Sequence, residues 1–295
     1  AYDRAMKERI FTPLGMTRTT HTLASTMIGD FAKPYDTTLR DEIGAVDQRN
    51  NDTVHPYRPA GGAWSSAHDM ALYVQNELSQ GLLPNGKRMV AADALLARRV
   101  HNVPAGDNVW YGMGLFDDTS KGVSIISHGG SLFGYKSNWF AIPSAGVGLV
   151  VLTNSDSGQA LLGTVRRKLL EVLYDAKPEA AENVASIAAR SVERRKKLLS
   201  ELTWPASAET EAQVVGRYAN ADLGPLIIAR EDGRLMMHTT AMHSEVAARK
   251  NPDGTVSLVT VAPGFAGADV LITERNGKRV LVLNDSQHEY VWVKQ

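Results

Sequence analysis

The chain has 295 residues, and its 32 Lys and Arg balance its 32 Asp and Glu, so the formal net charge is zero. This balance gives no electrostatic basis for binding nucleic acid. There is no cysteine, which excludes disulfides and a thiolate nucleophile. The length predicts about two domains, and no apolar run has the length of a membrane span.

The first hundred residues predict helices separated by one long irregular segment. An apolar stripe predicts a helix over 2–11, and because the chain opens inside it we expect further sequence upstream. Residues 17–59 are polar and contain three prolines, and loops of this length are usually functional or disordered. Ser66 is a good N-cap for a helix over 67–79, and a shorter helix is expected over 91–100.

Between residues 111 and 154 the pattern changes to strands. The run 111–116 contains two glycines that permit close backbone approach, and we expect it to form a hairpin with the next strand. That next strand, 123–127, is β-branched and is followed by the polar run 128–131, His-Gly-Gly-Ser. Strands are also expected over 139–142 and 148–153. A polar segment where a strand ought to continue often marks a functional site.

The last third of the chain has a different character. Helices are expected over 158–173 and 178–202. After residue 205, short alternating runs recur about every ten residues and are joined by turn sequences such as Asn276-Gly277. Eight evenly spaced strands indicate a small antiparallel β-barrel.

No metal or cofactor site is expected. The chain contains no His-Glu-x-x-His, and His238 and His243, in neighbouring barrel strands, are expected at the surface. A Gly-x-Ser-x-Gly elbow and a phosphate-binding glycine loop are also absent from the sequence.

His128 and the two glycines after it carry the strongest chemical signal. Two glycines remove side chains from one segment, which lets a substrate backbone lie against it and exposes N–H groups to an anionic intermediate. An imidazole beside them suits proton transfer near neutral pH. In isolation, the same sequence also fits an ordinary turn.

Six sequence motifs indicate a resemblance to a known family. They are Ile10-Phe11-x-Pro13-Leu14-Gly15-Met16-x-x-Thr19, Pro59-Ala60-Gly61-Gly62-x-x-Ser65-Ser66-Ala67-x-Asp69-Met70-Ala71, Tyr111-Gly112-x-Gly114, His128-Gly129-Gly130, Gly134-x-x-Ser137 and Pro143-x-x-Gly146-x-Gly148-x-Val150-Val151-Leu152-x-Asn154. In this order they resemble the C-terminal half of the serine β-lactamase-related family. That family includes class C β-lactamases, penicillin-binding peptidases, D-aminopeptidases and lactamase-like esterases.

The resemblance implies roles for particular residues. His128 stands where the family has the Lys of Lys-Thr-Gly, Gly130 stands at its Gly, and the N–H of Ser131 would be an oxyanion donor. The implied substrate-binding residues are Gly129, Tyr111, Ser137, Gly61 and Gly62. Histidine in place of lysine is the form found in D-aminopeptidases and esterases of the family, so we do not expect β-lactam turnover.

The implied fold is α+β, in three parts. Residues 1–176 would be the C-terminal portion of a β-lactamase-like hydrolase domain, an antiparallel sheet with helices. Residues 177–204 would be a helical linker, and residues 205–295 an eight-stranded lipocalin-like β-barrel.

The family's nucleophile motif, Ser-x-x-Lys, occurs nowhere in the 295 residues. The only Tyr-x-Asn, at Tyr218, lies in a barrel strand and is read as chance. We therefore expect a serine hydrolase that cleaves a small peptide, amide or ester through an acyl-enzyme, whose nucleophile lies in an N-terminal fragment or partner chain.

Such a protein would act without a cofactor, and the resemblance favours a periplasmic or secreted location and leaves homo-oligomers open. The alternative is a non-catalytic binding or regulatory protein with a lipocalin-like ligand module.

Overall fold

The computed structural model describes residues 1–240 and 242–295. Contacts divide them into two units, one made of Ala1–Lys33 and Asn51–Val184, the other of Pro34–Asn50 and Ala185–Gln295. Within the described residues, no helix is long and apolar enough to cross a membrane.

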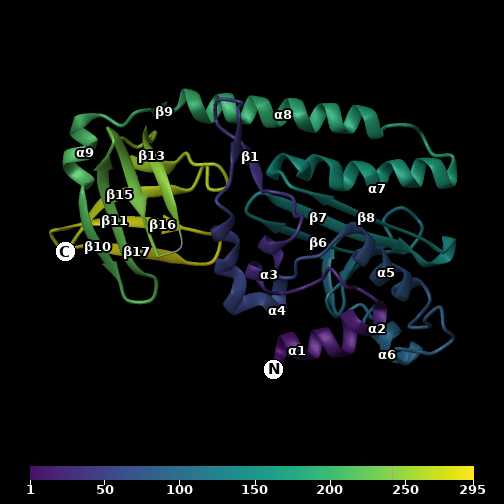
Figure 1. Ribbon diagram of the computed structural model, residues 1–295. Coiled ribbons are helices and arrows are strands. Elements are labelled where there is room, and N and C mark those ends of the chain that lie inside the picture. The colour runs from purple at the N-terminus through teal and green to yellow at the C-terminus, as the bar shows by residue number, and fades with distance from the viewer. Residues whose placement is uncertain (241) are drawn as a thin grey trace. The chain divides into compact units, whose positions relative to one another are not determined.

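The first unit is built on a six-stranded antiparallel sheet (Figure 1). Its strands, in spatial order, are β3 (Val103–Gly106), β4 (Val109–Tyr111), β5 (Phe116–Asp118), β6 (Ile125–Leu132), β7 (Tyr135–Ile142) and β8 (Val147–Thr153). The α-helices of this unit are α1 (Tyr2–Met6), α2 (Thr12–Leu14), α3 (Leu23–Ile28), α4 (Arg58–Gly61), α5 (Ala67–Leu78), α6 (Ala92–Ala97) and α7 (Gln159–Tyr174). Helix α8 (Ala180–Ser200) begins in this unit and continues into the second.

Alternation along the strands gives the sheet two apolar faces. Ile126, Trp139 and Ala141 pack with Val74 of α5. The intervening residues Ile125, Phe140 and Ile142 pack with Leu170 of α7. Helices α5 and α7 therefore cover opposite faces of the sheet (Figure 1).

Two sequence-based expectations about these strands were wrong in detail. The strand that begins at Ile125 does not stop before His128, because β7 pairs with it as far as Leu132. The expected strand over 111–116 is split into β4 and β5 by a tight turn, in which the Gly112 N–H donates to the Leu115 carbonyl at 2.9 Å and Gly114 has a positive φ of 72°. The expected hairpin is confirmed, because β5 pairs with β6.

The second unit holds the expected eight-stranded barrel. Its strands are β10 (Gly216–Asn220), β11 (Gly224–Glu231), β12 (Arg234–His238), β13 (His243–Lys250), β14 (Val256–Thr260), β15 (Asp269–Arg275), β16 (Lys278–Asn284) and β17 (Glu289–Lys294). Each pairs antiparallel with the next, and β10 pairs with β17, which closes the barrel. Strand β9 (Leu202–Thr203) extends the sheet beside β13, and α9 (Ala208–Val214) precedes the barrel.

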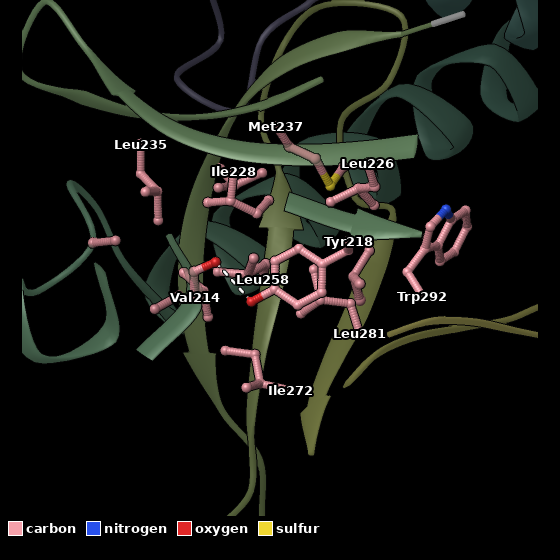
Figure 2. Packing of buried hydrophobic residues seen from close by; sticks show 14 residues of the cluster. Val214, Tyr218, Leu226, Ile228, Leu235, Met237, Leu258, Ile272, Leu281 and Trp292 are labelled. Atoms are coloured by element: carbon pink, nitrogen blue, oxygen red, sulfur yellow. Dashed lines mark hydrogen bonds between the residues drawn. The ribbon is translucent and has the colours of Figure 1, made fainter. Parts of the chain in front are cut away.

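Apolar side chains fill the barrel interior (Figure 2). Tyr218, Leu226, Ile228, Leu258 and Leu281 are all buried there. Eight strands enclose a space that side chains can just fill.

Residues 34–50, expected as irregular loop, form a hairpin that belongs to the second unit. Its strands are β1 (Tyr35–Thr37) and β2 (Ile43–Ala45). Leu39, in its turn, is buried against Ala247 of β13 and Val261, the residue after β14.

Candidate functional site

The candidate site lies along one edge of β6. Strand β5 pairs with β6 only over 125–127, whereas β7 pairs with it over 126–132. From His128 onward, the side of β6 that faces away from β7 therefore has no partner strand among the described residues. Apart from the Gly129 carbonyl, which the His128 ring contacts, alternate N–H and C=O groups in this stretch are available to bind another backbone.

The His128 ring is held by contacts at both nitrogens. Nδ1 lies 2.7 Å from the Gly129 carbonyl oxygen, which can only accept, so Nδ1 carries the proton. In the neutral imidazole Nε2 is then the acceptor, and the Tyr111 hydroxyl, 3.2 Å away, donates to it. The rings of Tyr111 and Phe116 lie against the imidazole, with centroids 5.9 and 5.7 Å from it. The neighbours thus fix the tautomer and orientation of His128.

The two glycines are exposed, and one of them lies close to a side chain of the neighbouring strand. Gly130 pairs with Ser137 across the β6–β7 ladder, and a Cβ on Gly130 would lie 2.5 Å from the Ser137 hydroxyl oxygen. A side chain at 130 would force the Ser137 hydroxyl to turn away, whereas the Ser137 Cβ, at 3.9 Å, would not clash. The edge of β6 is therefore bare where a substrate would approach.

A polar network fixes the turn end of the β6–β7 hairpin, and the sequence did not predict it. The Lys136 ammonium donates to the Ser131 hydroxyl at 2.8 Å and forms an ion pair with Asp156. Asp156 also accepts from the backbone N–H of Gly134, in the β6–β7 turn, at 3.1 Å. The Lys136 and Asp156 side chains are only 13% and 20% exposed. Nothing in the local sequence signals this pair, since 20 positions separate its partners.

The segment that includes Gly61 and Gly62 ends at Trp64, whose ring packs edge-on against Tyr135 of β7, with centroids 5.4 Å apart. Gly62 packs tightly on α4, where a Cβ would lie 2.9 Å from the Arg58 Cβ. Nearby, the buried Asn51 donates to the Phe133 carbonyl at 3.0 Å. The structure thus brings Tyr111, His128–Ser131 and Ser137 together, and places Gly61 and Gly62 in a segment linked to β7 through Trp64.

Other residues of the shared motifs serve the fold. The buried Asp69 accepts hydrogen bonds from the Thr19 hydroxyl and the Arg18 N–H, both at 2.8 Å. Burial by itself would raise the pKa of Asp69, but these hydrogen bonds outweigh it and lower that pKa. Asp69 therefore ties the start of α5 to the segment after α2 as a charged group.

Comparison with known proteins identifies the class to which this fold and site belong. The family model described as Beta-lactamase matches residues 1–173, more than half of the chain. The chain therefore belongs to the beta-lactamase family.

Among solved structures, the octameric penicillin-binding protein homologue from Pyrococcus abyssi matches all of this chain over 60% of its own length, at 17% identity and a TM-score of 0.51. A D-stereospecific amidohydrolase from Streptomyces sp. matches 60% of this chain and 49% of its own, at 24% identity and a TM-score of 0.44. A beta-lactamase/D-alanine carboxypeptidase from Pseudomonas syringae matches 60% of this chain and 54% of its own, at 17% identity and a TM-score of 0.43. Of these three, only the first has a TM-score above 0.5, and at 17% identity it shows a shared fold.

Proposed function

We propose that this chain is the His-Gly-Gly-bearing part of a serine hydrolase that cleaves a small peptide, amide or ester through an acyl-enzyme. The observation that carries the proposal is the open edge of β6 from His128 to Leu132, where two exposed glycines lie beside an oriented imidazole. A substrate backbone can pair with such an edge as an added strand.

Each residue has a chemical task in this proposal. The nucleophilic serine would attack the substrate carbonyl, and the Ser131 N–H would donate to the developing oxyanion together with the serine's own N–H. His128, held by Tyr111, would bind the substrate or transfer a proton at the same edge. A neutral imidazole offers no fixed positive charge to a substrate carboxylate, which favours substrates other than β-lactams.

The nucleophile is proposed to come from polypeptide outside these 295 residues, because no Ser-x-x-Lys occurs in them. A strand from such a polypeptide could pair with the free edge of the sheet. Strand β8 is apolar and lies at the edge, with β7 as its only partner strand in the described part of the chain. Family analogy extends the proposal to a periplasmic or secreted location.

The experiment is to label the complete protein with a fluorophosphonate probe and to map the modified serine by mass spectrometry. The proposal expects one labelled serine outside residues 1–295, and loss of ester hydrolysis in Gly130→Ala but not in the exposed-helix control Gly163→Ala. A label on a serine within the 295 residues would contradict the assignment of the nucleophile. No label at all would favour a non-catalytic binding protein.

The non-catalytic alternative gains no support from the barrel. Its interior is occupied by the cluster around Tyr218 and Leu258 (Figure 2), so a ligand would have to displace packed side chains.

A further inference from the structure

Two histidines that the proposed hydrolase does not use face each other on the barrel. His238, in β12, and His243, in β13, are directly opposite in the antiparallel ladder. Their Nδ1 atoms lie 2.7 Å apart and their ring centroids 5.0 Å apart. At this distance only one proton fits between the two nitrogens, so at least one of them presents a lone pair.

A carboxylate decides which nitrogen of His238 is protonated. Glu231 Oε1 lies 2.9 Å from His238 Nε2, and a carboxylate that close favours an N–H over a lone pair. The alignment is too poor for a hydrogen bond, so the buried Nε2 has no hydrogen-bond partner among the described residues. His238 therefore carries its proton on Nε2 and turns the lone pair of Nδ1 toward His243.

This is the arrangement that a metal-binding histidine needs. Ligating imidazoles usually donate their second ring N–H to a carboxylate, a backbone carbonyl or water, and here Glu231 acts on the Nε2 proton through its charge. In His243, which is exposed, the proton can move from Nδ1 to Nε2 through solvent when a cation takes its place. Both Nδ1 atoms then become ligands.

From this geometry we propose that His238 and His243 form a two-imidazole site for a divalent transition-metal ion, with Glu231 as the positioning carboxylate. Within the described residues, no group of three or more His, Cys, Asp or Glu converges as a metal site, so water would complete the coordination. Asp47 lies within electrostatic range of His243, but hydrogen bonds from Arg49 occupy both of its oxygens.

The affinity order of the divalent first-row metals favours copper over zinc at this site. Metal–nitrogen bonds of about 2.0 Å place neighbouring nitrogens about 2.9 Å apart in square coordination and about 3.3 Å apart in tetrahedral coordination. Both values exceed the 2.7 Å of the hydrogen-bonded pair, so the two rings must move slightly apart to admit an ion of either geometry. Copper binds nitrogen sites most tightly among the divalent first-row metals.

The test is a titration of the chain, as it exists, with CuCl2, followed by electron paramagnetic resonance and by metal-dependent stabilisation against unfolding. We expect one Cu2+ with at least two nitrogen ligands, bound more tightly than Zn2+. Binding should weaken in acid, because a ligating imidazole must be unprotonated.

Variants distinguish this site from copper bound elsewhere. His243→Gln, at an exposed position, should abolish the signal, and Glu231→Gln should weaken binding about 10-fold or more by loss of the positioning charge. The control His288→Gln, another exposed histidine of the barrel, should bind as the unchanged chain does. Equal copper binding by His243→Gln, or no two-nitrogen spectrum in the unchanged chain, would overturn the proposal, and neither outcome bears on the hydrolase activity.

Discussion

Tyr218 places a phenol hydroxyl inside the apolar barrel. The residue is 1% exposed, and its hydroxyl donates to the Val214 carbonyl at 2.7 Å. Burial raises the pKa of Tyr218 from 10.0 to about 12, because the phenolate would lose its hydration. The hydroxyl can remain in the core because it is neutral and paired.

This pKa predicts an alkaline loss of barrel stability. Because the folded pKa is above the unfolded one, the contribution of Tyr218 is complete below pH 10 and is lost as the pH rises toward 12, by about 2–3 kcal/mol in all. Urea unfolding between pH 8 and 12 should therefore show a steeper decline for the unchanged chain than for Tyr218→Phe. Tyr174→Phe, at a half-exposed position, is the control, and a Tyr218→Phe decline equal to that of the unchanged chain would contradict the prediction.

At the scale of single elements, two glycines are in opposite environments. Gly148, in β8, faces α5, and a Cβ there would lie 2.3 Å from Val74 Cγ1 and 3.2 Å from the Phe140 carbonyl oxygen. Gly163, in the interior of α7, is exposed and has no neighbouring atom within 4 Å of such a Cβ. Gly148 permits α5 to pack closely on β8, whereas Gly163 has no packing role and lowers the stability of α7.

The same substitution should therefore have opposite signs at the two sites. Gly148→Ala should destabilise the first unit by about 1–3 kcal/mol through overpacking against α5. Gly163→Ala should stabilise it by about 0.5–1 kcal/mol, because alanine loses less backbone entropy in a helix. Thermal and denaturant unfolding of both variants test this, and a stabilised Gly148→Ala would show that β8 and α5 are not packed as described.

The accuracy of the sequence-based predictions differed between elements for physical reasons. The eight barrel strands were predictable because alternation and turn residues are local signals. His128 and its glycines could be proposed from the sequence as a candidate site, but not as part of a continuous strand, because the pairing partner that extends β6 lies on the far side of a turn at Gly134. Lys136 and Asp156 were not predictable, since their ion pair exists only once β7 and the segment after β8 are side by side.

For the whole molecule, the division into units does not follow the order of the sequence. Residues 34–50 leave the first unit and return to it, yet their contacts lie with the barrel. Asp36 accepts from the Gly264 N–H at 3.0 Å, and the Arg40 guanidinium lies 4.1 Å above the Trp204 ring. The barrel unit is thus completed by a hairpin from the N-terminal part of the chain.

Because this hairpin belongs to the second unit, a single side chain in it should affect the stability of the barrel. Leu39→Ala removes a residue that is 5% exposed from the cluster with Ala247 and Val261, and should destabilise the second unit by about 2–5 kcal/mol. Because the loss lies within that unit, hydrogen exchange should accelerate in β13 and β14 and stay unchanged in β6 and β7.

The matched control is Ile43→Ala, on the same hairpin but 80% exposed, which should leave exchange in both units as it was. Equal acceleration in β6 and β7 on loss of Leu39 would mean that the two units unfold together. Unchanged exchange in β13 and β14 would mean that the hairpin adds nothing to the barrel. Either result would contradict the assignment of residues 34–50 to the second unit.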